Sequence, residues 1–394
     1  MTTVKLSATP AVNLNSVDKA AGVSSNFLEA TTGSDVDETN ARLVENRHSV
    51  VPKIAVNSIQ RLERTPSGPV PPPKIGSTID LDENVVKAFP DKEAKVLGAM
   101  EYGKSLWGMT AKIDVELPHG QQRSYFMKTV RQGDLGRVIC EGELKSLQEI
   151  HKTCPGFCPE PYGWGQFARD PDVYFLLVEF RNIGAQPAEP SLLAASLARL
   201  HSNSRSPTDM FGFGTRTCHA RMDQAVDFWS ESWAAVYGSH LRHVVNLAKE
   251  YLKWAEFDMV ANLTVEKVVP RLLLPLQADG RILKPCLVHG DCWDGNTAMD
   301  GETGEALIFD VCSFYAHHEY DTGNWRTPRH RLSAPAYIEA YNRLMPPSEP
   351  VEEWDARNIL YSLPFNLGNL MFVPNSTQRQ VVYQDMVNLC RESN

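Results

Sequence analysis

The chain has 394 residues, a formal net charge of -9, 42% hydrophobic residues and 22% charged residues. This length is typical of two or three domains, and the hydrophobic content allows a sizeable core. The negative charge argues against a nucleic-acid surface and a polybasic membrane anchor. The sequence has no apolar run of roughly 18 residues, so we expect no membrane span.

Eight cysteines are scattered along the chain without the paired spacing of a zinc site. The N-terminus also lacks the charged-then-apolar pattern of a secretory signal. We therefore expect reduced thiols and a cytoplasmic protein.

Residues 1–85 differ in composition from the rest. They are rich in Ser, Thr, Val, Asn and Pro, include the Pro-rich stretch 69–73, and lack sustained periodicity. This composition predicts a largely disordered leader. A dispensable tail and a docking arm both remain open, and composition favours the tail.

Residues 86–180 contain strand patterns. Residues 110–117 alternate apolar and polar, 124–130 return after a turn, and 173–180 form a dense apolar run typical of a buried strand. Residues 141–151 place apolar side chains at helical spacing. We predict a small β-rich N-lobe that binds ATP.

Residues 181–394 are mainly helical in pattern. A short strand pair is expected around residues 287–310. The predicted helices cover 191–201, 224–254, 262–276, 334–344, 355–370 and the C-terminal region. A β-rich lobe followed by a larger helical lobe predicts an α+β, two-lobed fold like that of protein kinases, with the catalytic loop and substrate site in the helical lobe.

Residues 287–296 carry the strongest functional signal. His289, Asp291 and Asn296 follow the order H-x-D-x(4)-N, and Asp310 ends a later apolar run. Phosphoryl transfer from ATP needs a carboxylate for the acceptor hydroxyl and oxygen ligands for magnesium. A lone Asp is more often a helix cap, but the set of three favours catalysis. We predict Asp291 as the base, and Asn296 and Asp310 as Mg²⁺ ligands.

Lys128 follows an apolar strand segment, as does the kinase lysine that reaches the ATP phosphates. That lysine is held by a glutamate on the next helix. Glu143 is the favoured partner because Leu144, Leu147 and Ile150 would face the core beside it, and Glu141 is the rival.

Two further segments are candidates for the nucleotide site. Gly103 and Gly108 bracket a turn before a strand, which is a weak signal for a phosphate-covering loop because it matches neither G-x-G-x-x-G nor a P-loop. Glu179 and Phe180 end a buried strand where the interlobe hinge is expected, and the backbone there would bind adenine.

The segment after Asp310 supplies candidate substrate contacts. Glu319 and Asp321 either fix a helix terminus or bind a cationic substrate, and both interpretations remain open. A structural metal at the adjacent histidines 317 and 318 is disfavoured, because neighbouring histidines point differently in most backbones. The candidate substrate contacts are Trp293, Tyr315, His317, Glu319 and Asp321.

These motifs together resemble one family. Residues 287–296 look like the L-x-H-G-D-L-W-x-G-N loop of the fructosamine (ketosamine) 3-kinases, and residues 308–321 resemble their D-P-A-x-x-Y-G-x-x-E-x-D segment. Residues 125–128 match the family's F-V-K strand. Residues 197–201 with 211–213 match its L-x-x-L-H and F-G-F pair. The resemblance covers about residues 95–390 and leaves out the leader.

The resemblance implies an aminoglycoside-phosphotransferase-like kinase fold. It also implies ATP-dependent phosphorylation of the 3-hydroxyl of ketosamines, namely ribulosamine and fructosamine adducts on protein lysines or free amines. The phosphorylated adduct falls apart, so the reaction is a deglycation. The substrate would be a small ketosamine or a glycated protein, and the sequence leaves monomer and homodimer open.

Four positions depart from the family pattern: Val311, Cys312, Ala316 and His240. They are expected near the substrate and leave phosphoryl transfer intact. Similar drift in fungal-type relatives favours a fungal-type member. One alternative is a kinase of another small hydroxylated metabolite in a specialised biosynthetic pathway. A second alternative is an inactive kinase-fold binding protein, which the intact candidate site argues against.

Overall fold

The computed structural model describes residues 75–103, 108–184, 188–373 and 376–392, all within the compact unit 60–394. The expected leader lies outside the described residues as far as residue 74. The first described strand, β1 (Ile75–Thr78), pairs with the next strand of the sheet. The folded part therefore includes residues that the sequence placed in the leader.

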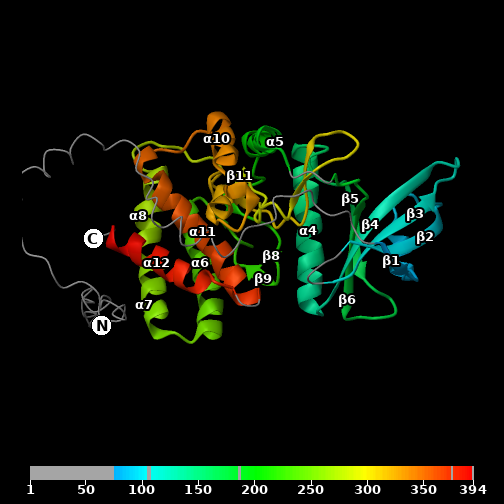
Figure 1. Cartoon of the computed structure of the whole chain (residues 1–394), viewed down its shortest axis with the longest axis horizontal. Helices are drawn as coiled ribbons and strands as arrows, with labels where there is room; N and C mark the ends of the chain where they lie inside the picture. The colour runs from blue at the N-terminus through cyan, green and yellow to red at the C-terminus, as the bar shows by residue number, and fades with distance from the viewer. Residues whose placement is uncertain (1–74, 104–107, 185–187, 374–375, 393–394) are drawn as a thin grey trace, which may run out of the picture. The chain divides into compact units, whose positions relative to one another are not determined.

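A six-stranded antiparallel sheet forms the N-lobe, shown in Figure 1, in the order β1-β2-β3-β4-β6-β5. Strands β3, β4 and β6 lie where the sequence predicted strands, and residues along β3 alternate between buried and half-buried. The remaining bounds are β2 (Lys95–Tyr102), β3 (Thr110–Glu116), β4 (Gln122–Arg131), β5 (Pro161–Gln166) and β6 (Val173–Glu179).

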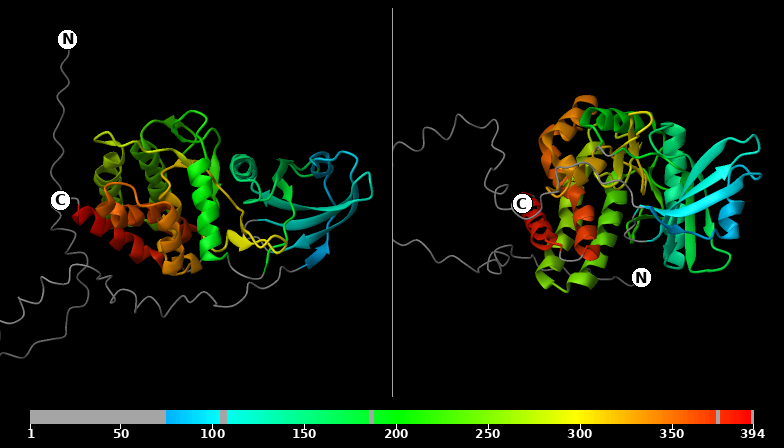
Figure 2. Two further views of the ribbon diagram at one scale, coloured as in Figure 1. Left: turned by 90° about the horizontal axis from the view of Figure 1, so that it is seen from above. Right: turned by 45° about the vertical axis from the view of Figure 1, so that its right-hand side comes forward.

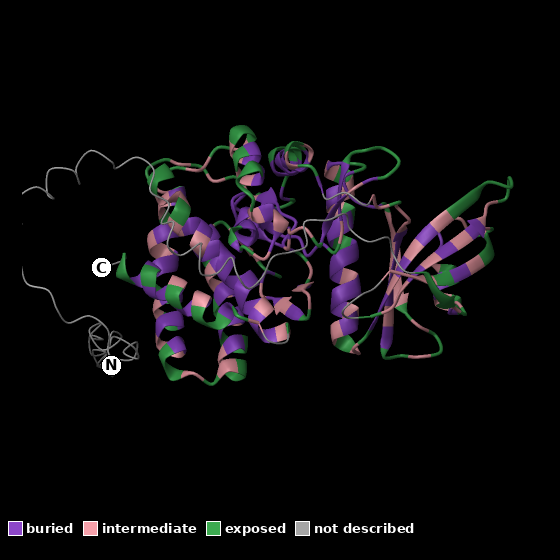
Figure 3. Cartoon of the chain, viewed as in Figure 1, coloured by how far each residue is buried: buried purple, intermediate pink, exposed green. Residues whose placement is uncertain are grey.

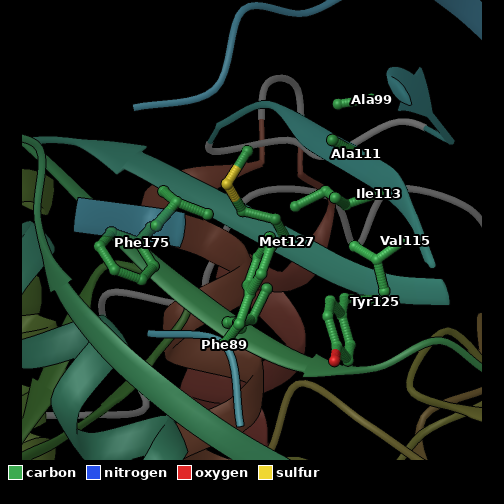
Figure 4. Packing of buried hydrophobic residues seen from close by; sticks show 10 residues of the cluster. Phe89, Ala99, Ala111, Ile113, Val115, Tyr125, Met127 and Phe175 are labelled. Atoms are coloured by element: carbon green, nitrogen blue, oxygen red, sulfur yellow. The ribbon is translucent and has the colours of Figure 1, made fainter. Parts of the chain in front are cut away.

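The N-lobe core lies between this sheet and the short helix α3 (Glu83–Lys87). Phe89 follows α3, and its ring centre lies 5.0 Å from that of Tyr125. Figure 4 shows both rings and Met127 among the buried residues of this cluster. Burial of large apolar side chains stabilises the sheet by roughly 1.5–3 kcal/mol for each side chain. This packing holds β4, and therefore Lys128, in a rigid frame.

Helix α4 (Asp134–Thr153) packs against β5 and β6 and is buried along much of its length, as Figure 3 shows. It begins at Asp134, earlier than the predicted start at residue 141. The additional first turn includes Gly136, whose missing side chain allows the helix to approach the backbone of Val130. The helix carries Glu143 toward β4.

The C-lobe is mainly helical and lies beside α4 in the views of Figures 1 and 2. None of the described helices is long and apolar enough to cross a membrane. Its helices are α5 (Pro190–Asn203), α6 (Trp233–Leu252), α7 (Ala255–Leu263), α8 (Val269–Leu273), α9 (Tyr320–Gly323), α10 (Pro335–Leu344), α11 (Trp354–Phe372) and α12 (Gln378–Arg391).

Small sheets in the C-lobe carry the functional loops. One has the order β10-β7-β14-β11, and two hairpins are β8–β9 and β12–β13. Their bounds are β7 (Phe211–Gly212), β8 (Thr217–His219), β9 (Met222–Gln224), β10 (Trp229–Ser230), β11 (Cys286–Leu287), β12 (Thr297–Met299), β13 (Ala306–Ile308) and β14 (Tyr315–Ala316).

The helix predicted over 224–254 was wrong at its start. Residues 222–224 and 229–230 form strands β9 and β10, and α6 begins only at Trp233. The Ser232 side chain caps this helix by accepting a hydrogen bond from the Ala235 N–H. Trp229 instead pairs with Gly212 across the sheet, so a long-range strand pairing overrides the local helical pattern.

Candidate active site

The loop between β11 and β12 carries the predicted base, and a close backbone contact fixes its shape. Gly290 has φ of +90°, and a Cβ there would lie 2.2 Å from the Cys312 carbonyl oxygen. The Cys312 N–H donates to the His289 carbonyl at 3.0 Å. Only glycine satisfies both the left-handed conformation and this contact.

Asp321 holds the same loop from behind. Its carboxylate accepts hydrogen bonds from the backbone N–H groups of His289 (2.8 Å) and Gly290 (3.0 Å). Nε2 of His201, at the end of α5, lies 3.2 Å from the Asp321 carboxylate. Asp321 is fully buried, so it supports the loop and has no access to a substrate.

Asp291 is surrounded by hydrogen-bond donors, and its side chain is 14% exposed. Oδ1 accepts from Asn324 Nδ2 at 2.9 Å and lies 3.3 Å from His219 Nε2. Oδ2 accepts from Asn296 Nδ2 at 3.0 Å. These contacts fix the carboxylate plane, which is what a group that must receive a proton in one direction requires.

The charge state of Asp291 follows from these neighbours. Burial alone would raise the pKa of its carboxyl group. The larger effect of His219 and the smaller effect of His289 oppose burial, and the pKa of Asp291 lies below its ordinary value. Burial lowers the pKa of His289, whose Nδ1 accepts from the Asp291 N–H at 3.1 Å. Asp291 is therefore an ionised carboxylate at neutral pH.

Lys128, on β4, lies between two carboxylates. Its Nζ is 2.8 Å from Glu143 on α4 and 2.7 Å from Asp310. Burial alone would lower the pKa of Lys128, but Asp310 and Glu143 raise it above its ordinary value. The expected Lys128–Glu143 pair is therefore present, while the rival Glu141 pairs with Arg137 at 2.7 Å.

One cavity of about 690 Å³ joins the lysine cluster to Asp291. Lys128, Glu143 and Asp310 line one part of it, and Asp291 with Trp293 lines another. The cavity lining also includes Gly103, Glu179, Phe180, His219, Asn296, Val311, Asn324, Arg329, His330, Phe365 and Phe372. A cavity of this size suits a small-molecule site.

The predicted nucleotide-covering turn is described only at its two ends. Gly103 lines the cavity with φ of +83°, and residues 104–107 lie outside the described residues. A Cβ on Gly108 would lie 1.6 Å from the Thr129 carbonyl oxygen, so Gly108 is required for close packing against β4. Its position beside β4 explains the glycine without a nucleotide.

The predicted hinge residues line the cavity at the end of β6. The Phe180 ring lies edge-on to Tyr102 at 5.0 Å, and Nζ of Lys112 lies 5.0 Å from the same ring centre. Glu179 pairs with Arg181 at 3.3 Å, and Arg181 also lies 3.0 Å from Asp300 in the C-lobe. The hinge is therefore tied to both lobes.

Asn296 and Asp310 offer oxygen atoms of the kind that Mg²⁺ prefers. The Asn296 amide nitrogen donates to Asp291, so its amide oxygen is directed away from that carboxylate. Burial, together with the charge of Asp310, raises the pKa of Glu143 to about 7 although Lys128 opposes this. Two carboxylates share one ammonium here, and a cation at Asp310 would balance the excess negative charge.

Four predicted substrate contacts lie away from the cavity: Tyr315, His317, Glu319 and Asp321 are buried and absent from its described lining. The Tyr315 hydroxyl instead bonds Glu149, at 3.3 Å. These four residues support the fold of the C-lobe. The prediction that they contact the substrate does not agree with their positions. Of the five candidates, Trp293 alone lines the cavity.

The histidine pair is also structural. His317 bonds the hydroxyls of Tyr361 and Ser348, both at 2.9 Å. Nitrogen and oxygen atoms of His317, His318 and Glu319 lie within 4.8 Å of one another. However, these atoms already have protein partners, including the Arg357 guanidinium on Glu319 at 2.8 Å, so they do not suit a metal ion.

Three of the four family departures lie in the core. Cys312, Ala316 and His240 are buried and are not among the described residues that line the cavity, whereas Val311 does line it. The expectation that all four lie near the substrate is therefore wrong for three. His240 packs within the C-lobe, where its Nε2 lies 3.2 Å from the Tyr320 hydroxyl.

The burial of His240 gives a pH-dependence prediction. Burial, with smaller effects of His219 and His243, lowers the pKa of His240 from 6.5 to about 3. Below pH 6.5, His240 binds a proton in the unfolded chain but stays neutral in the folded chain. The contribution of His240 to the free energy of unfolding is therefore fully present above pH 6.5 and decreases as the pH falls. We expect this residue to cost about 1.4 kcal/mol per pH unit between pH 6.5 and pH 4.

Urea unfolding of wild type and His240→Phe from pH 7.5 to pH 4 measures this slope, because Phe keeps a ring and removes the titration. Relative to His240→Phe, wild type should lose about 2.3 kcal/mol of unfolding free energy over the two pH units below pH 6.5. His119→Phe, at an exposed position, should leave the slope unchanged. Parallel curves for wild type and His240→Phe would contradict the assignment.

Sequence reasoning missed His219 and Asn324, the two partners of Asp291 Oδ1. His219 ends β8, in a two-stranded hairpin far from the catalytic loop in sequence, and no motif marks it. Asn324 follows α9, three residues after the motif residue Asp321. Its proximity to that motif was the one signal that pointed to it.

We expect His219→Ala to lower kcat by about tenfold, because Asp291, the predicted base, loses a charged-group contact of roughly 1.5 kcal/mol. His219→Asn retains a donor and should recover most of the rate. Steady-state kcat and KM of both variants, with His119→Ala as the control, test this. Unchanged kcat in His219→Ala, or a loss equal in both variants, would show that the contact with Asp291 has no kinetic role.

The β-rich lobe, the helical lobe and the lysine–carboxylate cluster facing an aspartate loop define a protein of the two-lobed kinase class. Two bacterial crystal structures that carry the provisional name fructosamine-3-kinase share this fold. The one from Thermobifida fusca has a TM-score of 0.61 and 18% identity, and covers 79% of this chain and 100% of its own. The one from Haemophilus somnus has a TM-score of 0.58 and 17% identity, with 75% and 92% covered.

A sequence model described as fructosamine kinase matches residues 104–388. The match spans well over half of the chain, and the chain belongs to the fructosamine kinase family.

Several curated kinases are similar to part of the chain. The chloroplastic protein-ribulosamine 3-kinase of Arabidopsis thaliana is 25% identical over 60% of this chain and 68% of its own length. The corresponding indica rice protein is 28% identical over 51% and 55%. The ketosamine-3-kinase of Mus musculus is 29% identical over 50% and 67%. The matches thus span about half to two thirds of these relatives.

Proposed function

We propose that this chain is an ATP- and magnesium-dependent kinase that phosphorylates the 3-hydroxyl of ketosamines. The observation that carries the proposal is the single cavity that holds both the Lys128 cluster and Asp291. The family membership and the names of the relatives supply the acceptor class. The substrate would be a ribulosamine or fructosamine adduct on a small amine or a protein lysine, and its phosphorylation would lead to deglycation.

On the nucleotide side, Lys128 would bind the ATP phosphates, and Glu143 would keep its ammonium in place from α4. Asn296 and Asp310 would hold magnesium, which supplies charge neutralisation on the phosphates when bound. Asp310 is also the second carboxylate partner of Lys128, with its Oδ1 2.7 Å from Nζ. The hinge at Glu179 and Phe180 would contact the adenine through its backbone.

On the acceptor side, Asp291 would accept the proton of the 3-hydroxyl while the hydroxyl oxygen forms a bond to the γ-phosphorus. The bond from the γ-phosphorus to the bridging oxygen of ADP breaks, and ADP leaves. Asp291 suits this step because its pKa is held below the ordinary value, so the carboxylate is ionised and able to take the proton. Asn296 and Asn324 orient the carboxylate by donating one hydrogen bond to each oxygen.

The decisive experiment measures ATP consumption with fructosyl-lysine, ribulosyl-lysine and a set of unrelated sugars and alcohols. The phosphorylated position is then assigned by phosphorus–proton NMR. We expect turnover of ketosamines, with phosphate on O3. Turnover of non-ketosamine alcohols alone would contradict the proposal.

A kinase of another small hydroxylated metabolite is the second candidate, favoured by Val311, the one family departure that lines the cavity. Val311→Pro restores the family's usual residue. If the acceptor differs from that of the family, the variant should gain ketosamine turnover at the expense of the other substrate. If wild type already prefers ketosamines, this candidate is rejected.

A further inference from the structure

Asn324 carries a hydrogen-bonding atom that neither the fold nor the base uses. It directly follows α9 and, unlike Asp321 three positions earlier, it lines the cavity. Its Nδ2 donates to Asp291 Oδ1 at 2.9 Å. Its Oδ1 is buried and has no hydrogen-bond partner among the described residues. A buried amide oxygen without a donor is costly and calls for an explanation, and in a cavity wall that explanation is a ligand.

The orientation of this amide is fixed by its neighbours. Asp291 is an ionised carboxylate, which only accepts hydrogen bonds, so the amide nitrogen of Asn324 faces it and the amide oxygen points elsewhere. Helix α9 fixes the position of Asn324, because Asp321 binds the backbone of the loop that carries Asp291. Gly323 packs so closely on α11 that a Cβ there would lie 2.7 Å from the carbonyl carbon of Tyr361. The Asn324 oxygen is therefore held in place before any substrate binds.

His330 presents a second unfilled acceptor. It lines the cavity, is 7% exposed, and its ring centre lies 5.0 Å from that of Trp293. Its Nδ1 lies 3.6 Å from the Asp294 carboxylate, whereas its Nε2 has no partner in the part of the chain that the structure describes. Burial lowers the pKa of His330, so the ring is neutral. With its proton on the nitrogen that faces Asp294, the ring leaves Nε2 as an acceptor.

Both atoms require a ligand that donates hydrogen bonds, and hydroxyl groups are the donors that a sugar offers. The choice is narrow at Asn324, because its Oδ1 and Nδ2 share one carbon atom and Nδ2 lies 2.9 Å from the base. When the reacting hydroxyl donates to Asp291, the substrate group nearest Oδ1 is therefore one on a neighbouring carbon. The neighbours of C3 in a ketosamine are C2, a carbonyl carbon without a donor in the open-chain form, and C4, whose hydroxyl donates in open-chain and ring forms alike.

We propose, building on the ketosamine kinase function above, that Asn324 Oδ1 accepts a hydrogen bond from the 4-hydroxyl of the acceptor. The preferred acceptor is then a 3,4-diol, and Asn324 determines this specificity. It contacts the substrate through its oxygen and the base through its nitrogen. Because both contacts belong to one planar amide, binding of the 4-hydroxyl aligns the 3-hydroxyl with Asp291. An alcohol without a hydroxyl next to the reacting one leaves Oδ1 buried and unpaired.

The test compares kcat/KM of the wild-type enzyme for fructosyl-lysine and for its 4-deoxy analogue, which retains the 3-hydroxyl. We expect the analogue to be roughly 5- to 150-fold poorer, the usual effect of leaving one buried acceptor unpaired. Asn324→Leu keeps the approximate shape of the side chain and removes both polar atoms. It should lower kcat/KM for fructosyl-lysine and make the two substrates equivalent, and this change in their ratio isolates the contact with the 4-hydroxyl.

His219→Ala is the matched control, because His219 lies 3.3 Å from the same oxygen of Asp291. This variant should lower kcat/KM for both substrates equally and keep their ratio. Calorimetry with Mg-ATP verifies that each variant is folded.

Equal wild-type turnover of the two substrates overturns the inference whatever the variants do. An undiminished ratio in Asn324→Leu also overturns it, as does a ratio lost equally in His219→Ala. In these cases fructosyl-lysine is still a substrate, and the ketosamine kinase function stands. If fructosyl-lysine is not turned over while an unrelated alcohol is, the ketosamine function itself fails, and the role of Asn324 fails with it.

Discussion

Asp291→Asn is expected to lower kcat by roughly 10²- to 10⁴-fold, the usual contribution of a general base. The amide cannot accept the hydroxyl proton at neutral pH, yet it has nearly the same shape as the carboxylate. Asn296 and Asn324 each donate to one oxygen of Asp291 at 3.0 and 2.9 Å, so one of these contacts becomes unfavourable. The main loss should nevertheless appear in the chemical step.

The measurements are steady-state turnover on a ketosamine and calorimetric titration with Mg-ATP. The affinity for Mg-ATP should remain within a few-fold of wild type, because the residues proposed to hold the phosphates and the metal, Lys128 and Asp310, are unchanged in this variant. Asp227→Asn, at an exposed position, is the matched control and should retain full activity. Turnover of Asp291→Asn near the wild-type rate would exclude the residue as the base.

The parts of this site that sequence reasoning located are set by local pattern. Lys128 lies on a strand that alternates, and Glu143 lies on a helix whose apolar positions predict which face turns inward. Their contact at 2.8 Å follows from those two periodicities. Asp291 and Asn296 are five positions apart on one loop, so their proximity also needed no knowledge of distant segments.

The parts that it misjudged depend on contacts between distant segments. His219 reaches Asp291 from a hairpin more than seventy positions earlier, and no spacing rule connects them. Glu319 and Asp321 are motif residues, but a motif does not distinguish a side chain that touches the substrate from one that supports the loop. The structure distinguishes them by burial: Asp321 is buried and binds the backbone of the loop that carries Asp291.

The strongest stability effect is expected at the partner of Glu319. Arg357→Met should reduce the free energy of unfolding by about 3–5 kcal/mol, the usual cost of breaking a buried ion pair. Both side chains are almost fully buried. Arg357 Nε and Nη2 donate to the Glu319 carboxylate at 2.8 and 3.0 Å, and its guanidinium also donates to the carbonyls of Ser348 and Pro350, both at 2.7 Å. Without the arginine, a buried carboxylate remains without its charge partner.

Urea unfolding measures the loss, and the double variant Glu319→Gln/Arg357→Met should recover part of it, because no unpaired charge then remains in the core. Lys87→Met breaks the exposed pair with Glu83 at 3.2 Å and should change stability by less than about 0.5 kcal/mol. The double variant also decides the role of Glu319. If Glu319 only supports the fold, the folded double variant should have the wild-type KM for the acceptor. If Glu319 contacts the substrate, the KM for the acceptor should rise even under conditions where the double variant is fully folded.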